Sequence, residues 1–580
     1  MTIFAGIFAR HSNSGIPSSI IEVLQGAISR YPDDKNALIE YKKNNIYIAK
    51  IDIGALDEPG YFRDSQLSGF IAGDPILQQN SESAYSRFES LKFLASDISK
   101  DKQDVLRNCR GTYCAAIYDD ASNKLFLITD KIGVRPVYFW VYSDFIIFAS
   151  ALRILESLHF YRKEIDLKGI TEIACFGYPL SDRTPYKDIF SLYAGEIVCF
   201  DTDKIERKKY WDWNKLPSKR TEDLHLAKQL HTTFIESIKI RLKDQKIVAA
   251  FLSGGLDSRA IVAALRELNT DVLTANFAQQ GSQDQVFGQL AADLLGTHHS
   301  HLPRGKTTIG DSYHKLSTTN WINSKEYLSW NPMRPKVIWS GDGGSMGLGH
   351  IYQNSEIVDA ARKKDLVTAM RLFFSYNRWG IFPKLLKHTF SKSVKQLLAD
   401  GIHTELDSIQ PEDLGRKFYL FLLLNDQRRH MVEHFENIDL DRIEFELPFF
   451  DANFIAEIVQ QPIDRFLRHV FYLDWLEQFS SKVLEIPWQA YPGHVPCPLP
   501  IPENLEYQWE STQEDKKQDI NLALQFADLF SQNHEFMSSY INKFYFQLWK
   551  LSLQWGNSNS NRSYFVRFPA VLYRYWAKVQ

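Results

Sequence analysis

Six residues near the middle of the chain, Ser253-Gly254-Gly255-Leu256-Asp257-Ser258, have the composition of a phosphate-binding loop. The apolar run 247–252 before them predicts a short buried strand, and 259–265 predicts a helix. Two glycines let the backbone turn sharply and approach a ligand, and the N–H groups of the turn and first helical turn can then point at phosphate oxygens. Asp257 adds a carboxylate where the Mg²⁺ of a polyphosphate would bind. The segment predicts a nucleotide site.

The alternative interpretation is a serine-capped turn whose glycines serve geometry only. Asp257 and Ser258, in register after the glycines, favour the ligand site. The loop is not of the G-x-x-x-x-G-K-[ST] type. Gly305-Lys306-Thr307 matches the last three positions of that motif, but Ser300 stands where its first glycine is needed.

The whole-chain composition is that of a soluble globular protein. The 580 residues are 44% hydrophobic and 24% charged, with a formal net charge of −3, so no nucleic-acid or membrane partner is expected. No apolar stretch is long enough to span a bilayer, and the N-terminus does not resemble a signal peptide. Five scattered cysteines without a C-x-x-C pair favour a cytoplasmic location over a disulfide scaffold or a zinc site (positions 109, 114, 175, 199 and 497).

The chain divides into two regions with different periodicity. Residues 1 to about 212 are rich in predicted strands, with short helices such as 20–30 covering them (strands at 45–53, 112–119, 124–128, 137–141, 145–149 and 195–200). A polar linker follows at 217–223. Helices then alternate with strands, which predicts a doubly wound parallel sheet (helices at 226–242 and 285–295; strands at 247–252 and 272–277, with another starting at 301–302). After about residue 355 the chain is mostly helical, and the aromatic tail 540–576 is expected to dock as helices.

Segments in the first region resemble the class II glutamine amidotransferase domain of the asparagine synthetase family. Residues 110–119 are similar to the family's glycine-led strand that ends in Asp, and 130–139 to its D-R-x-G-x-[KR]-P-L-Y-Y segment. Residues 148–152 are similar to its F-A-S-E stretch, and Tyr210-Trp211 to its closing aromatic pair. The resemblance implies a layered α+β domain of the Ntn type over residues 1–215.

The second region resembles the ATP-pyrophosphatase synthetase domain of the same family, and the resemblance implies an α/β domain over residues 225–580. Residues 253–258 match the pyrophosphate loop in full, 340–346 are similar to the S-G-E-G-A-D-E loop, and 443–451 to V-E-x-R-x-P-F-L-D. The resemblance implies ATP as substrate, with AMP and pyrophosphate as products, and Mg²⁺ on Asp257. It also implies a set of ATP-binding residues (Leu252, Ser253, Gly254, Gly255, Asp257, Ser258, Ala275, Ser340 and Gly341).

The amidotransferase half departs from the family at its nucleophile. Glutamine-hydrolysing members carry a cysteine directly after the initiator Met, but this chain has Thr2 there and no cysteine before Cys109. The N-G-E-I-Y-N glutamine motif is also absent, and residues 67–74 lie in that region instead. Although a threonine can act as an N-terminal nucleophile, we expect this domain not to release ammonia from glutamine.

The synthetase half departs from the family at charged positions. Ser345 replaces the second acid of the S-G-E-G-A-D-E loop, and Glu446 replaces an Arg. Asp342 keeps the first acid of that loop, with a side chain that is shorter by one methylene. Tyr491 stands at about the position of the Lys that stabilises the transition state and pyrophosphate, a loss that normally costs several kcal/mol of barrier. Candidate replacement cations are Lys482, Arg465, Arg468 and His494.

The resemblance assigns catalytic positions to Asp342, Glu444 and Tyr491. Glu444 stands where cyclising members place an acid that activates the amine, with a buried structural salt bridge as the alternative. For Asp342 the alternative is a turn-forming role.

Two further groups of residues lie outside those positions. Arg428-Arg429 is interpreted either as a phosphate contact or as a solvated helix face. Zinc at the histidines 298, 299 and 301 is not expected.

The plan resembles β-lactam synthetase and the lasso-peptide cyclases, in which a silent amidotransferase domain precedes a working synthetase domain. A carboxylate is activated by ATP and Mg²⁺, and an amine of the same molecule attacks it with a high effective molarity. We therefore expect a cyclase of a small-molecule or peptide substrate; a precursor peptide and a maturation enzyme would then be partners. The alternatives are amidation of a sugar acid or aspartate with ammonia, and a nucleotide-binding scaffold that has lost catalysis.

Overall fold

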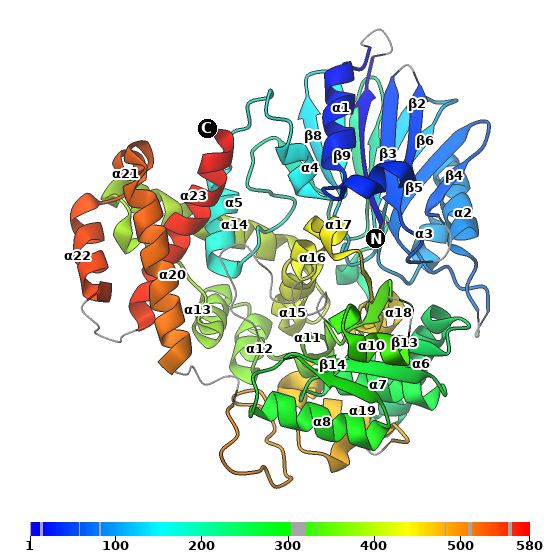
Figure 1. The fold of residues 1–580 in the computed structure, drawn as a ribbon, viewed down its shortest axis with the longest axis vertical. Coiled ribbons are helices and arrows are strands. Elements are labelled where there is room, and N and C mark those ends of the chain that lie inside the picture. The colour runs from blue at the N-terminus through cyan, green and yellow to red at the C-terminus, as the bar shows by residue number, and fades with distance from the viewer. Residues whose placement is uncertain are drawn as a thin grey trace.

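The N-terminal part of the chain is built on antiparallel sheets. The computed structural model describes residues 2–11, 15–43, 45–56, 59–80, 83–302, 321–331, 333, 335–481, 483–507, 513–554 and 560–580. Within these residues, two six-stranded sheets lie face to face (Figure 1). In spatial order the first contains β10 (Ile189–Ser191), β8 (Tyr138–Tyr142), β9 (Phe145–Ala149), β1 (Thr2–Ala9), β3 (Ile46–Asp52) and β2 (Leu38–Lys43). The second contains β12 (Ile205–Lys209), β11 (Glu196–Phe200), β7 (Lys124–Thr129), β6 (Tyr113–Asp119), β5 (Leu67–Gly73) and β4 (Tyr61–Arg63).

Apolar side chains fill the space between the two sheets. Phe4 and Phe8 of β1 meet Phe70 of β5 and Val198 of β11, and all four are fully buried. Because side chains alternate across a strand, the other faces need their own cover. Helix α1 (Ser18–Ala27) covers the first sheet, and α2 (Arg87–Ser99) with α3 (Asp104–Asn108) covers the second. The expected layered α+β domain is confirmed, and the helix predicted at 20–30 begins and ends slightly earlier.

A five-stranded parallel sheet forms the second part of the fold. Its spatial order is β15 (His298–His301), β14 (Asp271–Asn276), β13 (Ile247–Phe251), β16 (Val337–Trp339) and β17 (Glu444–Glu446). From the central β13 the chain passes outward through α7 (Asp257–Glu267) and α8 (Gln283–Leu295), and then returns to the other side of β13. The strand order therefore reverses between β13 and β16, the place where ligands bind in open α/β sheets. The predicted α/β fold is confirmed, although the strand expected to start at 301 ends there.

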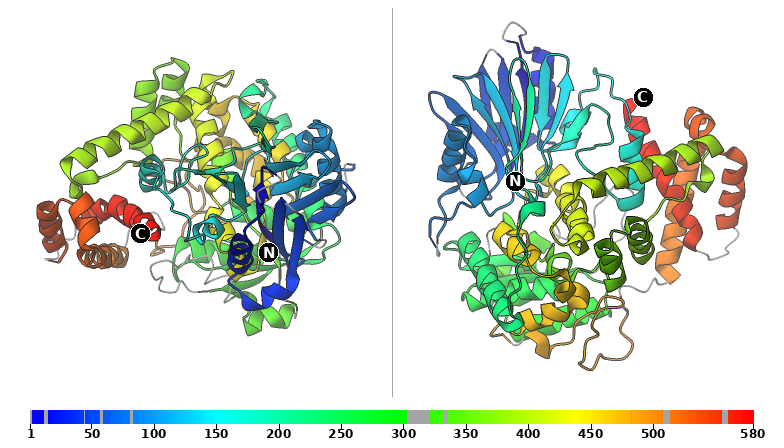
Figure 2. Two further views of the ribbon diagram at one scale, coloured as in Figure 1. Left: turned by 90° about the horizontal axis from the view of Figure 1, so that it is seen from above. Right: turned by 180° about the vertical axis from the view of Figure 1, so that it is seen from behind.

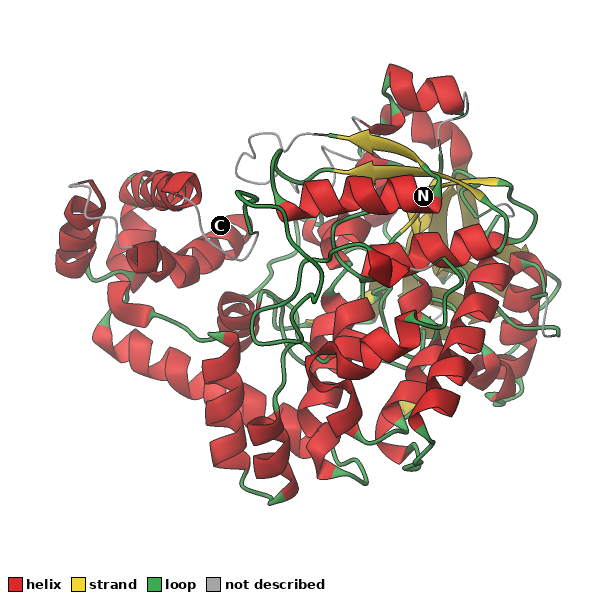
Figure 3. Ribbon diagram, turned by 90° about the horizontal axis from the view of Figure 1, so that it is seen from below, coloured by secondary structure: helices red, strands yellow, loops and turns green. Residues whose placement is uncertain are grey.

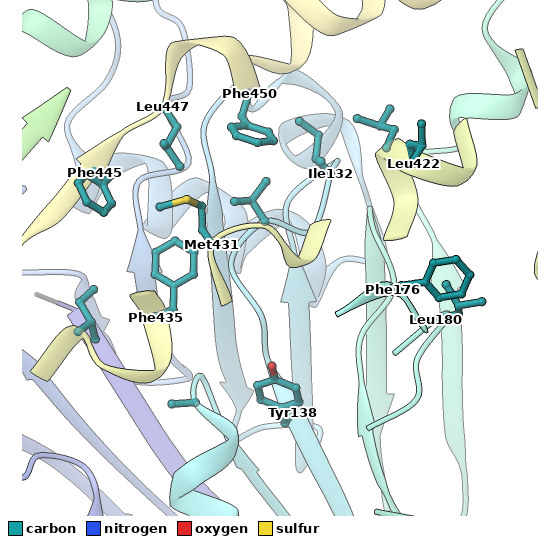
Figure 4. Packing of buried hydrophobic residues seen from close by; sticks show 14 of the residues in the cluster. Ile132, Tyr138, Phe176, Leu180, Leu422, Met431, Phe435, Phe445, Leu447 and Phe450 are labelled. Carbon is teal, nitrogen blue, oxygen red and sulfur yellow. The ribbon is translucent and has the colours of Figure 1, made fainter. Parts of the chain in front are cut away.

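Each face of the parallel sheet packs on a different core. On one face, α6 (Asp223–Leu242), α7 and α19 (Val470–Leu476) enclose an apolar cluster with Phe234 and Trp475. On the other face, Phe251 and Phe445 belong to a cluster that also contains residues of the N-terminal sheets. In Figure 4, Ile132 and Tyr138 of the N-terminal part lie among residues of the C-terminal half. The two parts therefore share one hydrophobic core.

Apart from α4 and α5, which belong to the N-terminal part, the remaining helices follow β15 in the chain, and the helical C-terminal part is confirmed (Figures 2 and 3). Phe568 and Trp576 of the last helix are buried in a cluster with Ile170 and Ala174 of α5, so the tail docks on the N-terminal domain too. No helix within the described residues combines the length and apolar character needed to cross a bilayer. The helices are α4 (Leu152–Glu156), α5 (Leu167–Phe176), α10 (Lys325–Trp330), α11 (Gly344–Gly349), α12 (Ser355–Arg362), α13 (Leu366–Asn377), α14 (His388–Ser408), α15 (Lys417–Phe421), α16 (Val432–Glu436), α17 (Ile438–Asp441), α18 (Ala452–Val459), α20 (Gln513–Ser531), α21 (His534–Tyr540), α22 (Lys543–Gln554) and α23 (Arg567–Val579).

Buried charges also join the two parts. Asp451, fully buried at the start of α18, pairs with Arg110 of the N-terminal domain at 3.0 Å and with Arg241 of α6 at 2.9 Å. Arg428 donates to the carbonyl oxygen of Leu192 at 2.7 Å, and both Arg428 and Arg429 donate to that of Ser181. Both expectations for these two arginines were therefore wrong: they are buried in the junction and bind backbone oxygens of the N-terminal domain.

Replacing Asp451 by Ala leaves two buried guanidinium groups without their shared carboxylate. We expect the free energy of unfolding to fall by about 3–5 kcal/mol, the usual cost of breaking a buried ion pair. Denaturant unfolding measures the change. The matched control is Glu164→Gln, because Glu164 pairs with Lys187 on the surface, where both side chains are more than half exposed. A loss no larger than that of the control would show that the junction does not depend on Asp451.

Candidate active site

The loop between β13 and α7 lies at the carboxyl edge of the parallel sheet. Two glycines here are required by close approach: a Cβ on Gly254 of this loop would lie 2.7 Å from Cα of Asp284, and one on Gly341, which follows β16, would lie 2.6 Å from the Ser258 nitrogen. The Ser258 hydroxyl accepts from the Ser253 N–H at 2.9 Å and so fixes the turn. No side chain caps α7, so the N–H groups at its start face the loop without a capping partner. This is the geometry that an anion needs.

A cavity of about 150 Å³ opens beside the loop. Small-molecule sites usually enclose about 300–1,000 Å³, so this cavity holds part of a nucleotide, such as its phosphates. It is lined by five segments: the loop, the start of α8, α11 and two segments far along the chain (among them Ser253, Gly255, Asp257, Asp284, Ser345, His469, Trp488, Tyr491 and His494).

Asp257 is a buried carboxylate held by neutral donors. One of its oxygens accepts from the backbone N–H and the hydroxyl of Ser345, at 2.9 and 2.7 Å, and the other accepts from the Tyr472 hydroxyl at 2.6 Å. Burial raises the pKa of Asp257 to about 6, with nearby Asp342 acting in the same direction, against these hydrogen bonds. Ser345, which stands where the resemblance implies a second acid, therefore supports Asp257 as a hydrogen-bond donor.

A second acid at the cavity is Asp284, at the start of α8. Its carboxylate accepts from the Gly254 N–H at 2.6 Å, and burial raises its pKa. No Lys or Arg lies among the described residues that line the cavity. Two acids without a cation suit Mg²⁺ carried on phosphate oxygens, because Mg²⁺ commonly takes one or two protein carboxylates and completes its shell from phosphate and water. A cluster of three or more acidic, His or Cys ligands is absent from the described part of the chain, so a metal held by protein alone does not fit.

The predicted ATP-binding residues take different places around the loop. Ser253, Gly255 and Asp257 line the cavity, as does Tyr491. Leu252 and Ala275 are buried and joined by a backbone hydrogen bond of 2.9 Å, so they support the loop from the sheet. The others lie in the loop itself or against it (Gly254, Ser258, Ser340 and Gly341). Their contacts with a nucleotide stay predictions.

Asp342 lies beside the cavity and forms an ion pair with His430. His430 Nε2 is 2.8 Å from the carboxylate, which also accepts from the Ser340 hydroxyl. Although its partial burial works against it, the bond to Asp342 raises the pKa of His430 to about 9, so the imidazole is protonated at pH 7. A catalytic role for Asp342 stays a prediction.

Glu444 lies away from the cavity, at the amino end of β17. It pairs in register with Val337, the first residue of β16, whereas the cavity opens at the carboxyl ends of the strands. It is fully buried, forms an ion pair with Arg135 and accepts from the Thr2 hydroxyl at 2.8 Å. Burial opposes its ionisation, but Arg135 lowers the pKa to about 2. The structure contains the buried salt bridge that was the alternative for Glu444, and a catalytic role for Glu444 stays a prediction.

Thr2 is enclosed by the same contacts. Its side-chain oxygen accepts from the Gly73 N–H at 3.0 Å while its hydroxyl donates to Glu444, and only 2% of the residue is exposed. A nucleophile needs an open approach and a base that accepts its proton. Here the acceptor is a carboxylate already paired with Arg135.

Of the four candidate replacement cations, His494 lines the cavity. Arg465 pairs with Asp223 at 3.2 Å, and Arg468 donates to the Gly493 carbonyl oxygen at 2.9 Å. Lys482 lies outside the described residues.

Three residues at the site were missed by the sequence analysis: Asp284, His469 and Tyr472. Asp284 had a usable signal, because it follows the second parallel strand much as Asp257 follows the first. His469 and Tyr472 had none, since they come from a helical region more than two hundred residues beyond the loop.

Comparisons with known proteins agree with this architecture. A family described as "Glutamine amidotransferase domain" matches residues 93–211, and one described as "Asparagine synthase" matches 229–315. A putative glutamine-hydrolysing asparagine synthetase 2 of Methanocaldococcus jannaschii is 27% identical over 55% of this chain and 70% of that protein. Asparagine synthetase 3 of Bacillus subtilis is 25% identical over 31% of this chain and 29% of that protein, so the match spans under a third of that relative.

Among solved structures, a glutamine phosphoribosylpyrophosphate amidotransferase from B. subtilis covers 50% of this chain and 79% of its own at 12% identity. Its TM-score of 0.25 is too low to support a structural argument.

An amidotransferase-type domain joined to a parallel-sheet synthetase-type domain is the arrangement expected of asparagine synthetase-like, ATP-dependent amidotransferases. With both domain matches and the similarity to asparagine synthetases, the chain is similar to the asparagine synthetase family in both halves. The matched ranges lie on either side of the linker at 217–223, while the boundaries 1–215 and 225–580 stay predictions.

Replacing Asp257 by Asn is expected to stabilise the fold at neutral pH. Folding raises the pKa of Asp257 from its ordinary 3.8 to about 6, so the folded protein holds the carboxyl proton more tightly than the unfolded chain does. As the pH rises from 4 to 6, loss of that proton therefore lowers the stability of the folded state increasingly. Above pH 6 the cost is about 3 kcal/mol. Thermal unfolding at pH 8 and pH 5 should show Asp257→Asn more stable, with a smaller difference at pH 5. An equal or lower stability at pH 8 would contradict the assignment.

Proposed function

We propose that the chain is an ATP-dependent, AMP-forming amide ligase whose N-terminal domain does not hydrolyse glutamine. The observation that carries the proposal is Asp257, a buried carboxylate held by neutral donors at the start of an uncapped helix and facing a cavity. A buried charge without a counter-charge is costly, so the site is built to receive a cation together with an anionic ligand. Mg²⁺ with the phosphates of ATP supplies both.

The proposed chemistry activates a carboxylate and then forms an amide. A substrate carboxylate oxygen attacks the α-phosphorus of ATP and pyrophosphate leaves; an amine then attacks the activated carbonyl carbon, AMP leaves, and the amine proton passes to a base. In this scheme the loop at 253–258 holds the pyrophosphate end through its N–H groups. Asp257 and Asp284 would hold Mg²⁺, and Trp488 also lines the cavity.

The geometry of Thr2 supports an amine source other than glutamine. Its hydroxyl is buried between Gly73 and Glu444, with no open side from which glutamine would approach it. An amine on the same molecule as the carboxylate would remove the need for released ammonia and would react at a high effective molarity. We therefore favour a cyclase of a peptide or small natural-product precursor, which would bring a precursor peptide and a maturation enzyme as partners.

The main alternative is amidation of a separate acid. Several relatives are described as asparagine synthetases, and one, from Gibberella zeae, as the amidase chry2, at 21% identity over 33% of this chain. Amidation of aspartate or a sugar acid with free ammonia fits the same site. A nucleotide-binding scaffold is favoured by one observation, the absence of Lys and Arg from the described residues lining the cavity.

Nucleotide binding and turnover separate these functions. Calorimetry with Mg²⁺ and ATP should show binding, and Asp257→Ala should weaken it at least tenfold, since the proposed metal ligand is lost. His388→Gln, an exposed position on α14, is the control. Pyrophosphate release is then measured with carboxylates that do or do not carry an internal amine, with and without ammonia. Binding without release for every carboxylate would select the scaffold.

Glutamine hydrolysis is expected to be absent, with Thr2 acting as a structural residue. Thr2→Ala removes a hydroxyl between two buried groups and should lower the free energy of unfolding by about 1–3 kcal/mol. Thr2→Ser keeps the hydroxyl and is the control. Glutamate release from glutamine should stay at background in all three proteins. Glutamate production by the wild type that disappears in Thr2→Ala would overturn this part of the proposal.

A further inference from the structure

Two histidines stand in the cavity where the family places a lysine. Tyr491, at about the lysine position, lines the cavity and stacks on the His469 ring, with ring centres 5.4 Å apart and planes 9° from parallel. His494 follows three residues later, and its backbone N–H donates to the Tyr491 carbonyl oxygen at 3.1 Å. Both imidazoles line the same cavity as Ser253, Gly255 and Asp257. The pair therefore lies opposite the phosphate loop.

The two rings are joined to Asp257 by a continuous chain of hydrogen bonds. Nδ1 of His469 lies 2.9 Å from Nδ1 of His494, and Nε2 of His469 lies 3.3 Å from the Ser345 hydroxyl oxygen. Ser345 gives its own proton to Asp257, so its oxygen accepts from His469 Nε2–H. In neutral His469, Nδ1 is then an acceptor, and His494 Nδ1–H donates to it. Nε2 of His494 is consequently the atom where a further proton can be added without breaking the chain.

The backbone around His469 is arranged to hold this ring in place. Arg468 and His469 both have left-handed backbones, with φ of +61° and +64°, a conformation that costs energy for residues other than glycine. The Val495 N–H donates to the Arg468 carbonyl oxygen at 3.1 Å, which ties the two histidine-bearing segments together. A Cβ on Gly349 would lie 2.4 Å from Nε2 of His469. Strain and close packing of this kind mark a positioned side chain.

The surroundings keep both rings neutral when no anion is present. Burial lowers the pKa of His469 to about 3, and that of His494 to about 4 with a contribution from Arg468, whereas a backbone hydrogen bond to Ile351 favours protonated His494. The other titratable groups near the pair are Asp257 on α7, Tyr472 on α19, Tyr491, His350 at the end of α11, and Asp284 at the cavity wall. A polyphosphate would add several negative charges, which favours the protonated ring.

We propose that His469 and His494 bind the polyphosphate end of the nucleotide in place of the family's lysine, and that the pair takes up a proton from solvent as the anion binds. This inference rests on the proposed function, because it assumes that the cavity receives nucleotide phosphates. The histidine pair differs from a lysine in one respect: its positive charge exists only while the anion is bound, whereas the lysine charge is permanent.

The test uses the full chain with Mg²⁺ and inorganic pyrophosphate as the probe. Calorimetry at pH 7 in buffers of different ionisation enthalpy should show net proton uptake by the wild type relative to His494→Gln. Because the protonated pair binds the anion better, wild-type affinity should fall severalfold more than that of the variant between pH 6 and pH 8. Comparing the two proteins cancels the ionisation of pyrophosphate itself. At pH 6.5, His494→Gln and His469→Gln should each bind about tenfold more weakly.

Two further variants separate binding from folding. His388→Gln, on the exposed face of α14, should bind like the wild type. Adding Tyr491→Lys to His494→Gln should restore affinity without the histidine-dependent pH slope, because a lysine charge is permanent. That rescue serves as the readout even where His469→Gln does not fold.

The outcomes distinguish this inference from the proposed function. Wild-type protein that binds neither Mg²⁺–pyrophosphate nor Mg²⁺–ATP overturns both. Wild-type binding with the same affinity, pH slope and proton count as His494→Gln overturns the histidine inference alone and leaves the ligase proposal standing.

Discussion

The cavity is organised around one constraint, a carboxylate that is buried without a positive partner. Asp257 is held by Ser345 and Tyr472, which donate hydrogen bonds but carry no charge, and burial raises its pKa to about 6. Burial disfavours the charged form of such a carboxyl group, so a cation that binds beside it is favoured because it compensates that charge. The residues that contact Asp257 come from the loop, α11 and α19. The packing of these residues keeps the Asp257 carboxylate buried. That buried charge in turn favours the binding of a cation in the cavity.

The N-terminal domain contributes to this arrangement as a structural partner. Its sheets share a hydrophobic core with the parallel sheet, and Arg110 and Arg135 reach across to Asp451 and Glu444. Both acids belong to the segment 443–451 that leads from β17 into α18. Thr2, at the position of the family's nucleophile, donates to one of them. The position that the family uses for its nucleophile is thus closed by a contact with the synthetase-type domain.

The sequence predicted the layers and the loop because their signals are local. Alternating apolar residues predicted β6, β7 and β9, and the Ser/Gly run 253–258 predicted the turn before α7. The partners of Glu444 and Arg428 were not predicted because these partners, Arg135 and Leu192, are hundreds of residues away in a domain interface that periodicity does not encode. His469 was missed for the same reason. It reaches the cavity through a left-handed turn, a conformation that no residue type at that position specifies.

Two departures from the family gain a common explanation in the cavity. A serine at 345 in place of an acid removes one negative charge, and a tyrosine at 491 in place of a lysine removes one positive charge, so the pair leaves the net charge of the site unchanged. Either change alone would leave a buried charge without compensation, which is expensive in a low-dielectric interior. In this chain Ser345, His469 and His494 are joined by hydrogen bonds between neutral groups. Any positive charge at the phosphates then has to be acquired on binding, and the imidazole is the side chain whose ordinary pKa makes that possible near neutral pH.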